Sequence, residues 1–257
     1  MKNFRQITFF IDFFKIKTYL YIEITKNITT MITKEYRERR SKGEKYEKIV
    51  GEFLDEYFYP TFSTNIDRNH DQDTQIQGLD LTVTGYDGVE YTIDEKAATL
   101  WIGRTLNTFA HEISSVNVSG NTYNGWFLSP QINQYYVYVW VDEVSNVSGK
   151  LENSKDITKA TVVMADKQHL FNYMKKNNIK SSELLQIGEY LRKNSIYSIQ
   201  FKGFKICMQV DKQEHAANIL IPRDALINEL SDYAVEINTK DANKVTVLHK
   251  TNNIINK

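Results

Sequence analysis

The 257-residue chain has one cysteine and no excess charge of either sign. The single thiol, Cys207, excludes an internal disulfide framework and any zinc site that needs two or more sulfurs, and it favours a reducing, cytoplasmic setting. The 32 basic side chains are balanced by 32 acidic ones, so the bulk composition indicates no particular partner. Any surface for nucleic acid must therefore come from local clustering of charge.

Several motifs with well-understood chemistry are also missing. The five histidines are scattered, with no pair at ligand spacing, which argues against an all-histidine metal site. The sequence has no Gly-x-x-x-x-Gly-Lys phosphate loop, no Gly-x-Gly-x-x-Gly turn, no Gly-x-Ser-x-Gly elbow and no His-Glu-x-x-His pair. These absences exclude phosphate-loop nucleotide hydrolases, Rossmann enzymes and zincins.

The N-terminal segment is rich in Phe and Ile but has no long apolar run. Asp12, Lys15 and Lys17 interrupt residues 1–21, whereas a secretory signal or a membrane-spanning helix needs an uninterrupted apolar stretch. We therefore expect no membrane segment here. We interpret residues 1–30 as an extension, or as the result of a misplaced translation start, before a single domain over residues 31–257; the intact mass of the natively expressed protein tests whether Met1 is used.

Hydrophobic periodicity predicts the main elements. Apolar residues at steps of three and four predict an amphipathic helix over 34–58, which Pro60 ends, and a polar loop follows over 63–77. Alternating residues around two glycines predict an antiparallel hairpin over 80–84 and 90–96. The remaining pattern predicts extended segments at 108–114, 135–141, 196–201, 204–210 and 217–221, and helices at 166–176, 181–193 and 224–234.

The hairpin carries a group of residues suited to metal-assisted chemistry. Asp94 and Lys96 are two positions apart on one strand, so their side chains share a face, and antiparallel pairing brings Asp80 to the same end of the hairpin. Two carboxylates can hold a hard cation such as Mg²⁺, while a lysine orients water or stabilises charge in phosphodiester hydrolysis. Glu47 lies at the edge of the apolar face of the first helix and is a fourth candidate, with Glu56 as the alternative for that role.

These residues resemble a known family motif. The segments Gly43–Val50, Gly78–Val83 and Ile93–Ala97 are similar, in this order, to the PD-(D/E)xK nuclease superfamily, although Leu79 replaces the proline of the motif. The resemblance implies a restriction-endonuclease-like α/β fold, with a mixed central sheet flanked by helices. Its core would span residues 43–141, and the C-terminal part would complete the fold.

The same resemblance implies specific roles. Asp80 and Asp94 would bind Mg²⁺ or Mn²⁺ with help from Glu47, Lys96 would be catalytic, and the backbone carbonyl of Glu95 would be an additional ligand. The implied activity is that of a Mg²⁺-dependent endodeoxyribonuclease with DNA as its partner. Two cuts in a duplex would be natural for a homodimer.

Two other interpretations remain open at this stage. Asp94 and Lys96 could form a simple ion pair on a surface hairpin, or the fold could serve as an inactive scaffold that binds DNA or protein. The residues between Ile66 and Glu95 include eight acidic side chains and one basic side chain, and such a concentration of charge favours a cation nearby. We expect the aromatic run Tyr135 to Trp140 to be core packing rather than a base-stacking surface.

Overall fold

The computed structural model describes residues 38, 41–117, 119–146, 149–209, 215–241 and 244–251. The interpretation of residues 1–30 as an extension lies outside these residues. The elements below, from the second turn of the first helix onward, belong to one compact unit, Lys45–Lys257. No helix in the described part is long and apolar enough to cross a membrane.

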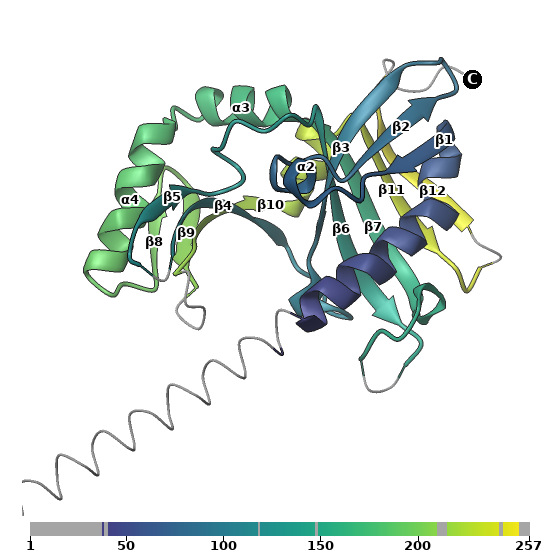
Figure 1. Cartoon of the computed structure of the whole chain (residues 1–257), viewed down its shortest axis with the longest axis horizontal. Coiled ribbons are helices and arrows are strands. Elements are labelled where there is room, and N and C mark those ends of the chain that lie inside the picture. Colours follow the sequence, from purple (N-terminus) through teal and green to yellow (C-terminus); the bar gives the residue numbers. More distant parts are fainter. Residues whose placement is uncertain are drawn as a thin grey trace, which may run out of the picture. The chain divides into compact units, whose positions relative to one another are not determined.

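A seven-stranded mixed sheet forms the centre of this unit (Figure 1). From one edge to the other, its strands are β1 (Ser63–Arg68), β2 (Leu81–Gly85), β3 (Glu90–Ala97), β6 (Tyr135–Val144), β7 (Ile157–Asp166), β11 (Tyr233–Asn238) and β12 (Lys244–Lys250). Neighbouring strands are antiparallel except β3 and β6, which run parallel. The predicted α/β class with a mixed sheet is therefore confirmed.

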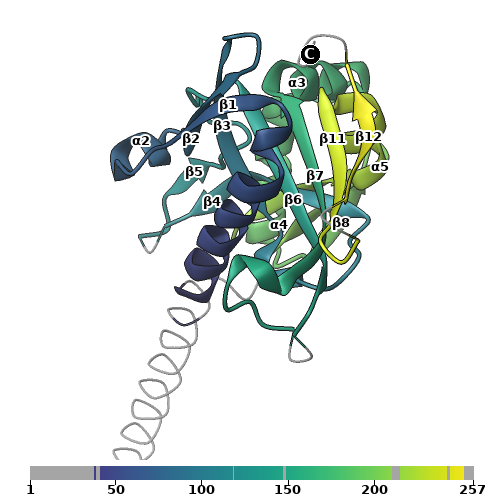
Figure 2. The same cartoon turned by 90° about the vertical axis from the view of Figure 1, so that its right-hand side faces the viewer.

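The first helix covers one face of this sheet (Figures 1 and 2). It is helical over residues 41–57. Its apolar face, which includes Tyr46, Phe53 and Leu54, packs in one core cluster with Ile93 and Val137 of the sheet. The spacing of apolar residues thus correctly predicts the helix and its buried face within residues 41–57, whereas residues 34–37, 39 and 40 of the predicted helix lie outside the described residues. A 3₁₀ turn, η1 (Tyr59–Thr61), follows at Pro60.

A second layer covers the opposite face of the central sheet. It contains an antiparallel sheet of strands β5 (Thr122–Asn124), β4 (Thr108–Val116), β10 (Ala217–Pro222), β9 (Phe204–Met208) and β8 (Ser198–Phe201). Its helical elements are α3 (Lys167–Lys176), α4 (Ser181–Lys193), the short α5 (Arg223–Ala225) and the π-helical turn η4 (Leu226–Leu230). Tyr136, Tyr138 and Trp140 of β6 are buried in this second core, as predicted for the aromatic run.

Most predicted elements are confirmed, and two are wrong in part. The segment 63–77 is not one loop, because it contains β1 and the short helix α2 (Gln72–Ile76), whose N-cap Asp71 accepts a hydrogen bond from the Thr74 amide. The helix expected over 224–234 ends at Leu230, and β11 begins at Tyr233. Tyr233 pairs with Met164 and Lys250, so two neighbouring strands hold the segment extended.

Candidate active site

Asp80 and Asp94 face each other across the β2–β3 pair. Leu81 pairs with Ile93, so Asp80, one residue earlier, lies opposite Asp94, one residue later. The Asp80 amide donates to the Ile93 carbonyl at 2.9 Å, and the Glu95 amide donates to Asp80 Oδ2 at 2.7 Å. Backbone pairing therefore fixes two carboxylates on the same face of the sheet.

The Asp94 carboxylate is buried and only partly satisfied. Asp94 is 1% exposed, and its Oδ1 atom lies 2.5 Å from Lys96 Nζ. Its Oδ2 atom is also buried and, when Asp80 is ionised, has no hydrogen-bond donor in the described part of the chain. Leaving a buried carboxylate oxygen without a donor is costly, and a cation, a water molecule or the proton of a neutral Asp80 would offset that cost.

The pKa of the Asp80 carboxyl is shifted by burial and by the neighbouring Asp94. Burial, followed by the negative charge of Asp94 and a hydrogen bond between the two carboxyl groups, raises the pKa of Asp80 to about 7, while Lys96 and the Glu95 amide act in the opposite direction. Two carboxylates that disfavour each other's ionisation are stabilised by a cation placed between them. The pair therefore has the electrostatic character of a cation site.

Four further side chains surround this pair, and the sequence motif identified none of them. The Trp126 ring centroid lies 5.1 Å from Lys96 Nζ. Tyr136 stands beside Asp94 in the β3–β6 register, and its hydroxyl lies 3.0 Å from Gln131 Oε1. Lys167 Nζ donates to the Gln131 carbonyl at 2.9 Å.

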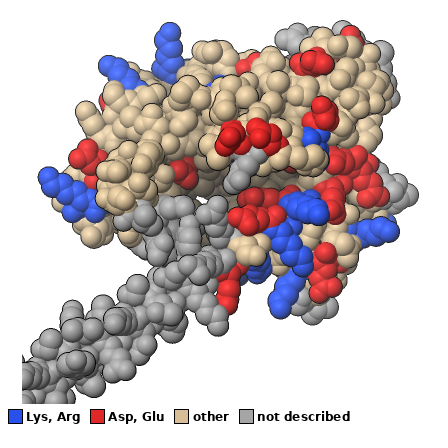
Figure 3. Space-filling model, viewed as in Figure 1, with Lys and Arg blue, Asp and Glu red and all other residues tan. Residues whose placement is uncertain are grey.

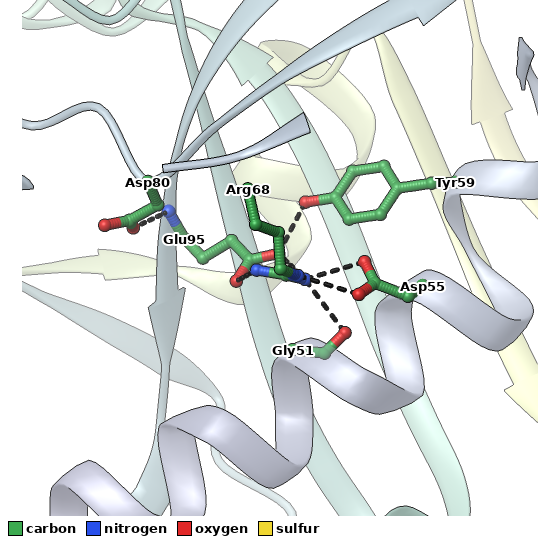
Figure 4. A network of polar contacts seen from close by, with 6 residues as sticks. All are labelled: Gly51, Asp55, Tyr59, Arg68, Asp80 and Glu95. Atoms are coloured by element: carbon green, nitrogen blue, oxygen red, sulfur yellow. Dashed lines mark hydrogen bonds and ion pairs between the residues drawn. The ribbon is translucent and has the colours of Figure 1, made fainter. Parts of the chain in front are cut away.

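The opposite face of β3 carries a separate ionic network (Figure 4). The Glu95 side chain accepts hydrogen bonds from Tyr59 at 2.7 Å and from Arg68 at 3.0 Å. Arg68 also binds Asp55 and the Gly51 carbonyl of the first helix. Burial raises the pKa of Glu95, although Arg68 lowers it. In Figure 4, Asp80 approaches the Glu95 backbone from one side while the Glu95 side chain extends to the other.

The structure brings together three of the four predicted site residues. Asp80, Asp94 and Lys96 share one face of the β2–β3 pair. Glu47 is exposed on the first helix, and that helix packs against the other face, which carries Ile93. Its alternative, Glu56, is exposed on the same helix. The helix therefore packs on the face of the sheet opposite to the one that carries the carboxylate pair.

The two carboxylates still fit a hard cation. Among the described residues, no three His, Cys, Asp or Glu side chains form a group that could hold a metal ion. Mg²⁺, however, is usually bound through one or two carboxylates and keeps several waters or substrate oxygens. The free Oδ2 of Asp94 and the neighbouring Asp80 supply such a donor set.

The residues that sequence reasoning missed come from distant parts of the chain. Gln131 and Tyr135 have a Gln-x-x-x-Tyr spacing, which carries little weight in the sequence because it lies beside a strand rather than on a helix; in the structure Gln131 hydrogen-bonds Tyr136. Lys167 has no local signal, since only the pairing of β6 with β7 brings it here.

Comparisons with known proteins identify no relative. No family model, no curated protein and no solved structure matches this chain.

Proposed function

We propose that this protein is a metal-dependent nuclease that hydrolyses DNA phosphodiester bonds. The observation that carries the proposal is the buried, unpartnered Oδ2 of Asp94, which lies next to Asp80 and within an ion pair to Lys96. The order of the residues, with Gly-x-Asp before β2 and Asp-x-Lys on β3, supports a relationship to the PD-(D/E)xK superfamily and its restriction-endonuclease-like fold.

Each residue has a distinct task in this proposal. Asp80 and Asp94 would hold Mg²⁺ or Mn²⁺, and the Glu95 carbonyl is a further donor that the resemblance suggests. When bound, the ion supplies Lewis acidity and lowers the pKa of a coordinated water. Lys96 Nζ, held by Asp94 and the Trp126 ring, donates hydrogen bonds to phosphate oxygens, where negative charge increases during hydrolysis.

The face of the molecule seen in Figure 3 shows no broad basic area. On the face shown in Figure 3, basic and acidic side chains are interspersed over the first helix, and the whole chain has no net charge. Binding of DNA therefore depends on individual cations near the site rather than on a broad basic area.

A cleavage assay tests the proposal. Supercoiled, linear and branched DNA would be incubated with the wild type in Mg²⁺, in Mn²⁺ and in EDTA. Lys96→Ala is the test variant, and Lys159→Ala is the matched control because Lys159 is also a strand lysine in a half-exposed ion pair, with Glu236 at 3.0 Å. Circular dichroism and thermal melting confirm that each variant is folded.

We expect cleavage by the wild type and by Lys159→Ala only when the metal is present. Lys96→Ala should lose about 100-fold or more of this activity, because it removes a donor aimed at developing charge. Metal-independent cleavage, or full activity of folded Lys96→Ala, contradicts the proposed mechanism. A wild type that binds DNA without cutting any substrate supports the scaffold interpretation instead.

A further inference from the structure

Lys167 ties the start of α3 to the segment that borders the site. It is the first residue of α3 and follows β7 directly. Its backbone amide donates to the Gln134 carbonyl, and its Nζ donates to the Gln131 carbonyl, both at 2.9 Å. The Gln134 amide in turn donates to the Thr92 carbonyl of β3 at 3.0 Å. The segment 131–134 therefore links Lys167 to the strand that carries Asp94.

Strand register also places Lys167 on the same side of the central sheet as Asp94, two strands away from it. Asp94 pairs with Tyr136 of β6, and Tyr136 pairs with Ala165 of β7, two residues before Lys167. Tyr136 and Ala165 are both buried in the second core, so this row of residues faces the same side of the sheet as Asp94. Lys167 lies two residues after Ala165, opposite Gln134, at the point where β7 ends.

Gln131 connects this row to the start of β2. Its Oε1 atom lies 3.0 Å from the Tyr136 hydroxyl. Its side chain also packs closely on Gly78, where an added Cβ would lie 2.7 Å from Gln131 Cδ. Gly78 is two residues before Asp80, so Gln131 contacts both the segment that leads into Asp80 and Tyr136, the neighbour of Asp94 in the β3–β6 register. Lys167 Nζ donates its hydrogen bond to the backbone carbonyl of this same Gln131.

The charge environment of Lys167 differs from that of Lys96. Burial lowers the pKa of Lys167, and the negative charge of Asp94 acts in the opposite direction. Lys96 is ion-paired directly with Asp94, whereas the Lys167 ammonium donates to a neutral carbonyl. An ammonium has three donors, so Lys167 retains donors for an anion near Asp94.

We propose that Lys167 is a substrate-binding residue of this site and contacts a non-bridging phosphate oxygen of bound DNA. This inference rests on the proposed nuclease function and extends it to a residue outside the sequence motif. A second ammonium on the same side of the sheet, within the electrostatic influence of Asp94, offsets the negative charge that a phosphate brings into the site. If Lys167 were only structural, it would serve to hold the segment 131–134 through the Gln131 carbonyl.

Two substitutions separate these roles. Lys167→Gln removes the charge but keeps an N–H donor for the Gln131 carbonyl, whereas Lys167→Arg keeps the charge. Lys176→Gln is the matched control, because Lys176 lies on the same helix, is 77% exposed and has only a 3.9 Å ion pair with Glu229. The readout is fluorescence anisotropy of a fluorescein-labelled 20-base-pair duplex in Ca²⁺, at several KCl concentrations, so that binding is measured apart from cleavage.

We expect Lys167→Gln to weaken binding about 10-fold and to reduce the slope of log K against log salt concentration by about one. Lys167→Arg and Lys176→Gln should keep the wild-type slope. An unchanged slope in Lys167→Gln, equal losses in Lys167→Gln and Lys176→Gln, or no binding of this duplex by the wild type overturns the inference. If Lys167→Gln does not fold, Lys167→Met replaces it. A reduced salt slope in Lys167→Met then supports the inference, and an unchanged salt slope overturns it.

Binding of the duplex without cleavage would contradict only the proposed function. If the duplex binds with the expected dependence on Lys167 but the wild type cuts no DNA in Mg²⁺ or Mn²⁺, the phosphate contact stands and the proposed hydrolysis fails. The two claims are therefore tested by different measurements.

Discussion

At the scale of single residues, the site is defined by an unusual degree of burial. Asp94 is almost fully buried, yet one of its oxygens has no hydrogen-bond partner among the described residues. An ion pair on a surface hairpin would contribute little and would expose both groups. The 2.5 Å pair of Asp94 with Lys96 instead lies against Trp126 and beside Tyr136. Because Asp94 is buried, its pair with Lys96 differs from the exposed ion pair on a surface hairpin that the sequence also allowed.

The pKa of Asp80 predicts how stability depends on pH without added divalent cation. An Asp side chain in an unfolded chain has a pKa of about 3.9, and burial together with Asp94 raises the pKa of Asp80 to about 7 in the fold. Between these values the folded state binds more protons than the unfolded state. This contribution to stability is therefore present below pH 4, falls as the pH rises and is lost above about pH 7.

The substitution Asp80→Asn removes the titrating carboxyl and with it the loss of stability toward high pH. The side-chain oxygen of the asparagine can still accept the hydrogen bond from the Glu95 amide. We expect the variant to be more stable than the wild type by roughly 1–3 kcal/mol at pH 8 in EDTA, since one pKa unit corresponds to about 1.4 kcal/mol. The difference should shrink toward pH 4. Urea unfolding at both pH values measures it, and a difference that grows toward acid pH contradicts this account.

The side-chain pattern of the hairpin was predictable, but its surroundings were not. Alternation along β3 places Asp94 and Lys96 on one face, and this follows from the sequence alone. The partners Trp126, Gln131 and Lys167 depend on contacts between distant segments. Glu47 illustrates the limit: helical periodicity places it at the edge of the apolar face, but it cannot say which face of the sheet that helix covers.

At the scale of elements, β3 is held from both sides. Asp94 and Lys96 project toward the second layer, while the Glu95 side chain joins β3 to β1 and the first helix through Arg68. Gly51 permits this junction, because a Cβ there would lie 3.1 Å from the Arg68 guanidinium, whose nitrogen donates to the Gly51 carbonyl at 2.9 Å. The Glu95 amide that holds Asp80 is thus anchored to the helix.

This close approach predicts different effects for two glycines of the first helix. Gly43→Ala meets open space, so it should raise the free energy of unfolding by about 0.5–1 kcal/mol through helix propensity. Gly51→Ala should not gain this stability, because Asp55 and Glu95 hold Arg68 in place. Urea unfolding of both variants checks the difference, and an equal gain in both would show that Arg68 moves away freely.

Elements with a local signal were predictable, and those defined by pairing were not. The helices α3 and α4 have apolar periodicity, and Asp166 caps α3 by accepting from the Gln168 amide. By contrast, β7 is buried on both faces and shows little alternation, while the edge strands β1 and β12 carry many exposed residues. Such strands are recognised only through their neighbours in the sheet.

At the scale of the whole described unit, the central sheet separates two hydrophobic cores. The first helix covers one core, and the second sheet with α3 and α4 covers the other, which borders the site. The residues after 141, to which the sequence assigned only completion of the fold, supply three strands of the central sheet, three of the second sheet and Lys167. The sequence predicts β8, β9 and β10 as extended segments, whereas β7, β11, β12 and the position of Lys167 depend on long-range pairings such as β6 with β7.

The central claim is that Asp80 and Asp94 together hold a divalent cation. Calorimetric titration of Mn²⁺ into the wild type at pH 8 tests it most directly, with Asp94→Asn as the test variant. Asp67→Asn is the control, since Asp67 is an exposed carboxylate on β1. A cation at about 100 times its Kd should also stabilise the fold by about 2.7 kcal/mol, which thermal melting detects.

We predict that the wild type and Asp67→Asn bind one ion per chain, and that Asp94→Asn binds it at least about 10-fold more weakly, because it lacks the charged oxygen that would face the ion. The absence of binding to the wild type at millimolar Mn²⁺, or equal affinity in folded Asp94→Asn, would contradict the account.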